Sequence, residues 1–315
     1  MKKLKTDNHT INVVMYHYVR EIKDSNYPNL KGLEFTDFKK QINFFCNNFN
    51  VLSNDDFKEI IISKKIPSKP SILLTFDDGY IDHYKYVFPY LKKKKITGNF
   101  YPPVKTIENK IVLDVNKLHF ILEKEQNHQK ILKEIDNFLI KENIKRISNE
   151  DIKKGSMKSR FDSKETNIIK RLLQFYLPEK IRKKIMNLLF TKILNIELND
   201  FSKILYMNKN QVKEMYSENM CFGSHGDFHY FLGKLKNKDQ EKEIMNSINF
   251  FKKLGFDTSS FSVCYPSNSY NSDTLKLLTK YNIDFGLTAF RGRIDKKNIS
   301  NNLIYPRFDA NDFLF

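Results

Sequence analysis

Short apolar runs alternate with amphipathic helical stretches over much of this chain, and that alternation limits the folds it can adopt. The run Ile11–Met15 predicts a buried strand, and Phe35–Phe49 follows it with apolar residues at helical spacing. Ser71–Thr75 is a second apolar run, bounded by Pro70 and by an Asp-Asp-Gly turn. Repeated β-α units of this length predict a parallel sheet, open or closed into a barrel, with its chemistry at the carboxyl ends of the strands.

A central region with a different pattern interrupts this alternation. From about Leu113 to Glu218 the chain is rich in Lys and Glu, carries recurring Ile, Leu and Phe, and has almost no Gly, which predicts helices. We therefore expect an α/β domain made of residues 1–105 and 205–315 and a helical insertion spanning residues 106–204. In that domain the pattern predicts further strands at 98–101, 220–223, 261–265 and 285–287 and helices at 55–63, 82–94, 239–254 and 272–281.

Lysine dominates the charge of the chain. The 54 Lys and Arg residues exceed the 37 Asp and Glu residues, for a formal net charge of +17. A field of this sign could attract nucleic acid, anionic lipid or an acidic glycan. The lysines are spread along the chain, however, and Lys92–Lys95 is their only dense run. Because Arg-rich or aromatic-interleaved clusters are missing, we expect no specific nucleic-acid partner, while peripheral membrane contact stays open.

Several protein classes are excluded or disfavoured by the sequence. No apolar run approaches the roughly 20 residues that span a bilayer, so no transmembrane segment is expected. The first residues lack the apolar core and cleavage site of a signal peptide, which predicts a cytoplasmic protein. Cys46, Cys221 and Cys264 are odd in number and widely spaced, which argues against a disulfide framework or a zinc ribbon. The oligomeric state is left open.

Two adjacent carboxylates, Asp77 and Asp78, follow the strand predicted at Ser71–Thr75. Charges beside a buried strand are costly unless a cation, hydrogen bonds or water neutralise them. Neighbouring side chains at a strand end also point in different directions, so the two can take different roles. The alternative is an Asp-Asp-Gly turn that only caps the next helix.

Two histidines, His225 and His229, follow the strand predicted at 220–223. Histidines four residues apart can converge on one metal ion if the loop turns helically. One buried and one surface histidine is the alternative. Together with an aspartate they would form a three-ligand set that leaves positions for water, as a hydrolytic zinc or similar divalent ion requires.

The motifs TFDDGY (75–80) and SHGDFH (224–229) resemble the first two signature motifs of the polysaccharide deacetylases, the NodB-homology group or carbohydrate esterase family 4. The segment 264–271 is similar to the third. The resemblance covers about Asn12–Tyr101 and Tyr206–Phe315 and implies a distorted (β/α)7 barrel. The helical insertion and an N-terminal Tyr-His pair resemble a subgroup associated with bacterial surface-polysaccharide biosynthesis.

The resemblance also implies roles for individual residues. Asp78, His225 and His229 would bind a divalent metal ion, in the first place zinc, with cobalt, nickel or manganese as alternatives. Such an ion acidifies water and polarises the amide carbonyl of an N-acetyl group. Asp77 would be the general base, and the backbone N–H of Ser267 would help to stabilise the oxyanion.

The chain departs from the family pattern in its general acid. The usual late Leu-x-His motif is missing, since no histidine follows His229. His17, at the end of the first strand, is the candidate proton donor; a core histidine is the alternative, and Asp77 could instead shuttle the proton. Arg307 lies in a Tyr-Pro-Arg segment that resembles the segment at the end of many of these domains. It either pairs with Asp77 and keeps that carboxylate ionised, or it forms a structural salt bridge.

The candidate substrate-binding residues are Tyr80, Pro266 and Tyr270. The two tyrosines could stack on a sugar or belong to the core. Asn268 stands where the family usually has Gly, which Asn can replace in a left-handed turn. His83 is expected at the rim of the site. Cys264 is expected to be a small buried apolar residue and not a nucleophile.

The sequence thus predicts a metal-dependent hydrolase that removes an N-acetyl group from an amino sugar of a cell-surface glycan or its precursor. Its partner would be an N-acetylated saccharide, and the bond cleaved is a non-peptide carbon–nitrogen bond. The alternative is a catalytically silent member that binds a saccharide or another protein. Retention of both aspartates and both histidines disfavours that alternative. A basic nucleic-acid-binding protein would rest on net charge alone.

Overall fold

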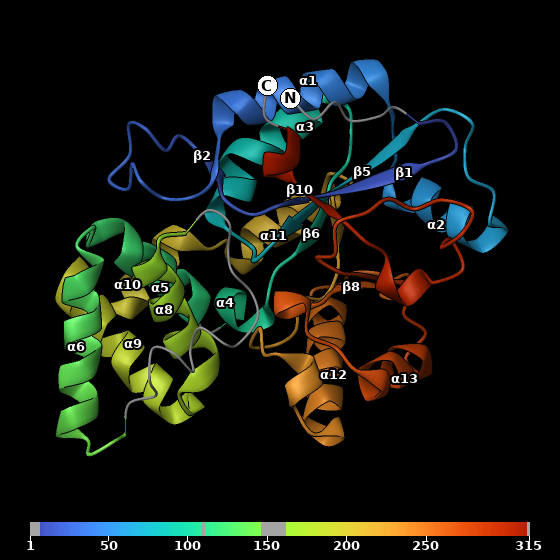
Figure 1. Ribbon diagram of the computed structural model, residues 1–315. Helices are drawn as coiled ribbons and strands as arrows, with labels where there is room; N and C mark the ends of the chain where they lie inside the picture. The colour runs from blue at the N-terminus through green and yellow to red at the C-terminus, as the bar shows by residue number, and fades with distance from the viewer. Residues whose placement is uncertain (1–6, 109–110, 146–161, 314–315) are drawn as a thin grey trace. The chain divides into compact units, whose positions relative to one another are not determined.

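A computed structural model describes residues 7–108, 111–145 and 162–313 (Figure 1). The chain divides into two compact units. Unit 1 takes the described residues up to 21, from 32 to 111 and from 202 onward, and unit 2 takes 22–31 and the described residues of 112–201. Parts of the predicted insertion, 109–110 and 146–161, lie outside the described residues. The boundaries expected from the sequence, after 105 and before 205, stay a prediction.

Parallel strands form the framework of unit 1. They are β1 (Ile11–Tyr16), β2 (Val19–Arg20), β3 (Leu33–Glu34), β4 (Asn50–Val51), β5 (Ser71–Asp77), β6 (Asn99–Tyr101), β7 (Cys221–Phe222), β8 (Ser262–Cys264), β9 (Phe285–Leu287) and β10 (Phe308–Asp309). One sheet has the order β10-β1-β5-β6-β7, with β4 also on β5, and separate pairs are formed by β8 with β9 and by β2 with β3. All seven residues of β5 are buried, as is typical of a parallel strand covered on both faces.

Two single bridges continue the parallel order beyond these sheets. Ser224, just after β7, pairs with Val263 of β8, and Leu287 of β9 pairs with Tyr305, just before β10. Apart from β4 and the separate β2–β3 pair, the strands therefore follow one another in parallel around a ring, and single bridges instead of full ladders make two of its joins. The α/β class predicted from the sequence is confirmed.

Helices cover the strands of unit 1. They are α1 (Phe35–Asn48), α2 (Asn54–Ser63), α3 (Phe88–Lys94), α4 (Val104–Glu108), α11 (Lys209–Ser217), α12 (Asn237–Lys253) and α13 (Ser272–Lys280), with short turns η1 (His83–Val87), η3 (Leu232–Lys234), η4 (Pro266–Asn268), η5 (Asn302–Ile304) and η6 (Ala310–Phe313). The helix predicted at 82–94 begins as the π-helical turn η1, in which the N–H of Phe88 donates to the carbonyl of His83. Pro89 follows at the start of α3 and has no N–H to donate, so the regular ladder resumes only beyond it.

The core of unit 1 lies on both faces of the sheet, because side chains alternate along each strand. Val14 and Tyr16 of β1 join a large cluster that includes Phe38 of α1. Ile11 and Val13 of the same strand join a second cluster with residues of β5, β8 and β9. In Figure 1, α1 and α3 lie together beside the strands, and α12 lies against α13.

Unit 2 is helical, as the composition of the insertion predicts. It contains α5 (Asp114–Lys124), α6 (His128–Lys141), α8 (Lys164–Arg171), η2 (Leu172–Tyr176) and α9 (Glu179–Leu194), and α10 (Leu198–Leu205) begins in it. Aromatic rings fill its interior: the ring of Phe120 lies 4.8 Å from Tyr27 and 4.8 Å from Phe201. Across the described residues, helices that are both long enough and apolar enough to cross a membrane are not found.

Candidate metal and catalytic site

The two sequence motifs meet at the carboxyl ends of β5 and β7. Asp77 is the last residue of β5, and Asp78 follows it in a left-handed conformation with φ 70°. Gly79 is also left-handed, with φ +70°, and a Cβ there would lie 2.5 Å from the Cβ of Pro102. Only glycine therefore fits the turn that directs Asp78 toward the second motif.

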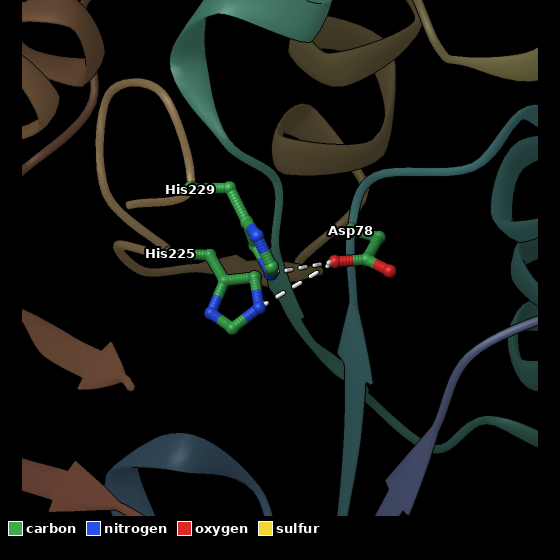
Figure 2. Close-up of side chains that lie close together, drawn as sticks. All are labelled: Asp78, His225 and His229. Atoms are coloured by element: carbon green, nitrogen blue, oxygen red, sulfur yellow. Dashed lines mark ion pairs between the residues drawn. The ribbon is translucent and has the colours of Figure 1, made fainter. Parts of the chain in front are cut away.

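Asp78, His225 and His229 converge on one point (Figure 2). Oδ1 of Asp78 lies 3.5 Å from Nε2 of His225 and 3.5 Å from Nε2 of His229. The three possible ligand atoms all lie within 4.8 Å of one another. Within the described ranges, no other group of three or more His, Cys, Asp or Glu residues has such a geometry.

The histidines converge through an irregular loop and not through the helical turn considered from the sequence. The segment from 225 to 229 contains no helix, and Gly226 and His229 have φ of 79° and 62°. Nδ1 of His225 lies 2.9 Å from the carbonyl oxygen of Cys264 in β8. This contact orients the ring so that Nε2 faces Asp78, the arrangement found for histidines that bind metal ions.

The donor atoms fit a divalent cation. Oδ2 of Asp78 accepts a hydrogen bond from the hydroxyl of Tyr80 at 2.6 Å, whereas Oδ1 is buried and makes no hydrogen bond. A buried carboxylate oxygen without a partner is costly, and a cation between it and the two imidazoles would remove that cost. One carboxylate oxygen with two imidazole nitrogens is a common ligand set for zinc and related ions.

Burial and neighbouring charges set the protonation of these three residues. Burial acts to raise the pKa of Asp78, but the neighbouring histidines lower it well below its usual value. Burial acts to lower the pKa of His225, but Asp78 and Asp77 raise it. Burial, followed by the charge of His225, lowers the pKa of His229 to about 4. His229 is therefore neutral at pH 7, the form of imidazole that binds a metal ion.

Arg307 holds the carboxylate of Asp77 through both oxygens. Its Nη1 and Nη2 donate to Oδ1 and Oδ2 of Asp77 at 2.9 and 2.8 Å. The guanidinium also donates to the carbonyl of Thr288 at 2.9 Å and to Oγ1 of Thr75 at 3.2 Å. Burial acts to raise the pKa of Asp77, but the Arg307 charge lowers it to about 2. The contact between Arg307 and Asp77 considered from the sequence is therefore present.

His17 follows β1 at the same end of the sheet as the two aspartates. Tyr16 of β1 lies opposite Phe76 of β5, so His17 and Asp77 leave adjacent strands together. The imidazole of His17 is close enough to lower the pKa values of Asp77 and Asp78. Its role as a proton donor stays a prediction.

His83, expected at the rim, is instead completely buried. Its ring packs against the rings of Phe76 and Phe100. Its Nε2 lies 2.9 Å from the carbonyl oxygen of His17. Burial lowers its pKa to about 4, so the ring is neutral at pH 7 and donates from Nε2. His83 is buried because it lies in η1, on the side of the turn that faces the core.

The tyrosines predicted to bind substrate lie in different surroundings. Tyr80 is fully buried, and its ring stacks on Tyr18 and Tyr206 at 4.1 and 6.0 Å. It has no exposed face for a sugar and supports Asp78 through its hydroxyl, in line with the core alternative. Tyr270 is half-buried, with its ring 4.6 Å from that of Tyr265.

The third motif forms the tight turn η4 after β8. Pro266 is buried, while Ser267 and Asn268 are left-handed with φ of 51° and 57°. The conformation expected for Asn268 is therefore confirmed. Oδ1 of Asn268 also accepts the N–H of Ala289 at 2.8 Å. Cys264 is completely buried, as expected, and burial raises the pKa of its thiol well above the usual value.

Sequence reasoning missed Glu243, a buried acid on α12. Its Oε2 accepts the N–H groups of Asp227 and Phe228 at 2.8 and 3.0 Å. The sequence does contain an indication of this residue. Glu243 lies on the same helix face as Ile244 and Phe251, which is the buried face of α12. An acid on an apolar face requires a partner, and here the partner is the histidine loop.

Comparisons with known proteins point to one family. A family model described as polysaccharide deacetylase matches residues 64–157 and 177–286. The chain is 30% identical over 98 residues to YxkH of Bacillus subtilis (strain 168), a protein classed with the polysaccharide deacetylases. That match covers 31% of this chain and 33% of YxkH, so it spans about a third of the relative's length.

Solved structures with a similar fold include two described as deacetylases, together with IcaB. The Streptococcus pyogenes deacetylase PplD, in complex with acetate, has a TM-score of 0.58 at 18% identity, over 96% of this chain and 93% of that one. IcaB from Ammonifex degensii has a TM-score of 0.57 at 14% identity, over 96% and 93%. The deacetylase domain of BpsB from Bordetella bronchiseptica has a TM-score of 0.54 at 14% identity, over 96% and 97%. At these identities the likeness shows the fold.

Proposed function

The chain belongs to the polysaccharide deacetylase family, and from this we propose that it hydrolyses the N-acetyl group of an amino sugar in a surface glycan or its precursor. The observation that carries the proposal is the cluster of Asp78, His225 and His229, with a buried carboxylate oxygen that makes no hydrogen bond. The cytoplasm as the place of reaction, and the surface-polysaccharide subgroup, rest on the sequence alone.

Asp78, His225 and His229 would hold a divalent ion, in the first place zinc, with cobalt, nickel or manganese as alternatives. When bound, such an ion acidifies water and polarises an amide carbonyl. Oδ1 of Asp78 and the two Nε2 atoms are the donors, since Oδ2 is engaged by Tyr80 and Nδ1 of His225 by Cys264. Both outer contacts orient the donors before any ion binds.

Asp77 would accept the proton of the attacking water. Its carboxylate is ionised at neutral pH, and Arg307 fixes the direction of both oxygens. Because Arg307 outweighs burial and lowers the pKa of Asp77, the proton that this carboxylate accepts must pass on to another group. The leaving nitrogen needs a proton because an amine anion is a very poor leaving group. His17 would supply it, and the backbone N–H of Ser267 would stabilise the oxyanion.

The test is acetate release from N-acetylated saccharides, with each candidate metal and with a chelator. Wild type should release acetate and expose free amines, and the chelator should stop the reaction. Asp77→Asn should lower the rate by about 10² or more while metal content stays unchanged. Asp257→Asn, at an exposed position of unit 1, is the matched control and should retain the wild-type rate. A metal-loaded wild type that releases no acetate from any saccharide would favour a silent binding protein.

A further inference from the structure

One buried carboxylate holds the loop that carries both histidines of the metal cluster. Oε2 of Glu243 accepts the N–H of Asp227 at 2.8 Å and the N–H of Phe228 at 3.0 Å. Both donors lie between His225 and His229 in the sequence. Glu243 is itself only 5% exposed, so its position is fixed by the packing of α12.

The loop backbone passes directly against this carboxylate. A Cβ at Gly226 would lie 2.9 Å from Oε2 of Glu243, and the residue is left-handed with φ +79°. On the other side, the N–H of Val104 donates to the carbonyl of Gly226 and that of Lys105 to the carbonyl of Asp227, at 3.2 and 2.9 Å. The loop is thus held between α4 and α12. Glu243 binds two of its N–H groups, the N–H of Gly226 donates to Oγ of Ser224 at 3.1 Å, and Asn246 of α12 donates to Oδ2 of Asp227 at 2.6 Å.

The loop contains left-handed residues and no helix, so its own backbone hydrogen bonds do not hold it. Without an acceptor, the buried N–H of Asp227 and the partly buried N–H of Phe228 would each carry a desolvation cost, which an opened loop would avoid. Burial raises the pKa of Glu243 to about 7, so removing this group from water has a cost of its own. In return, the carboxyl group supplies one acceptor oxygen for two N–H groups that lie between the histidines in the sequence.

We propose that Glu243 is a positioning residue that presets the separation of the His225 and His229 imidazoles and thereby sets the affinity of the site for its divalent ion. This inference rests on the proposed function, because it takes the two histidines as metal ligands. A loop that is already ordered pays no ordering cost when the ion binds. Loss of such an outer contact typically weakens metal binding by 10- to 100-fold.

Zinc affinity of the metal-free protein, measured by competition with a chelating dye, tests this directly. Glu243→Ala should bind zinc about 10- to 100-fold more weakly than wild type. Glu243→Gln keeps an oxygen that can accept both N–H groups and should stay within about threefold. Glu241→Ala is the matched control on α12: its carboxylate accepts from Lys280 and Tyr281, away from the loop, and zinc affinity should not change.

Glu243→Asp separates position from charge and covers the case in which the alanine variant does not fold. The Asp variant keeps the charge but withdraws the carboxylate oxygen by the length of one methylene group, so its zinc affinity should fall. The Glu243→Gln variant should retain the wild-type affinity. The opposite order, with Asp tight and Gln weak, would overturn the proposal, since charge and not position would then control affinity. Unchanged affinity in both Asp and Ala variants, with only a lower Tm of the metal-free protein, would likewise overturn it.

Failure of this inference can be told from failure of the proposed function. If wild type binds zinc, His225→Ala does not, and the Glu243 variants match wild type, only the positioning role is lost. If the Glu243 variants bind zinc as expected but no saccharide yields acetate, the positioning role is supported and the proposed deacetylation is contradicted. A wild type that binds none of the candidate ions would overturn both the metal site and the role of Glu243.

Discussion

Asp77 and Asp78 are adjacent in the sequence, but their carboxylates have different partners. Both oxygens of Asp77 accept from Arg307. Asp78 has one oxygen bonded to Tyr80 and one that makes no hydrogen bond and faces the histidines. Side chains that alternate at a strand end reach different surroundings, which is the division that the proposed mechanism requires of two neighbouring carboxylates.

His17→Ala tests the proton donor. The variant should keep its metal and lose about 10² in rate on an N-acetyl sugar, because the leaving amine must be protonated. The loss should be much smaller on an O-acetyl ester with an acidic leaving group, which hardly needs protonation. Both rates are followed as acetate release. Equal losses on the two substrates would point to a structural histidine, and no loss on either would assign the proton shuttle to Asp77.

Because His83 is buried in its neutral form, we expect the free energy of unfolding to fall in mild acid. Its folded-state pKa of about 4 lies below the ordinary value of 6.5, so the unfolded chain takes up a proton first as the pH falls. The contribution of His83 to the free energy of unfolding is therefore fully present above about pH 6.5. It falls by up to about 3 kcal/mol as the pH is lowered to 4. His83→Gln keeps a donor for the His17 carbonyl but does not titrate.

Urea unfolding of wild type and His83→Gln at pH 7, 5.5 and 4.5 measures this effect. The free energy of unfolding should fall more steeply with acid in wild type than in the variant. The other titrating groups are the same in both proteins, so their effect on the free energy of unfolding cancels in the difference between wild type and variant. Parallel pH profiles for the two proteins would show that His83 is not the group responsible.

At the scale of elements, the site depends on the turns that follow β5 and β7. The carboxyl ends of parallel strands lie at one edge, so residues far apart in sequence meet there. Asp78 and Gly79 leave β5 with left-handed φ, and the loop after β7 is bound by α12 through Glu243. The strands bring the ligands to one region, and the turns and α12 set their final direction.

Gly79→Ala should damage this turn in two ways. The new Cβ would meet Pro102 at 2.5 Å, and the φ of +70° is unfavourable for alanine. We expect a loss of more than about 2 kcal/mol in free energy of unfolding, together with weaker zinc binding. Gly255→Ala is the control, because φ there is +89° but nothing lies within 4 Å of the added Cβ. It should lose only about 1 kcal/mol in urea unfolding, and equal losses would contradict a role for the Pro102 contact.

At the scale of the whole molecule, we predict that the net charge of +17 does not mark a nucleic-acid surface. The dense run Lys92–Lys95 lies at the end of α3, where cations favourably oppose the helix dipole. Nζ of Lys92 also lies 2.8 Å from Oε1 of Glu218. Lys92 therefore has a local partner within unit 1.

Binding to a generic DNA duplex, followed by fluorescence anisotropy across a salt series, tests this reading of the charge. We expect dissociation constants weaker than about 1 μM at 150 mM salt, as for non-specific electrostatic contact. A tighter complex that weakens steeply with salt would show a nucleic-acid site that the scattered lysines conceal.

The sequence by itself determined the features that depend on near neighbours along the chain. Helical spacing and apolar runs located α1 and β9, and β9 spans the three residues expected. Motif position predicted that an aspartate after β5 and two histidines after β7 would meet, because each motif is a short segment that follows a recognisable strand, and the family resemblance selected Asp78 as the aspartate. The two-residue strand β10 was missed, since a run that short has no periodicity to detect.

Only the tertiary structure decided which distant side chains support the site. Arg307 reaches Asp77 across 230 residues of sequence, and Glu243 reaches the histidine loop from the next helix. His83 turned out to be buried because η1 directs it into the core. Such pairings depend on how strands close around a ring and on which helix packs behind which loop. Spacing along the chain does not contain that information, because the energy of each contact exists only once both segments are in place.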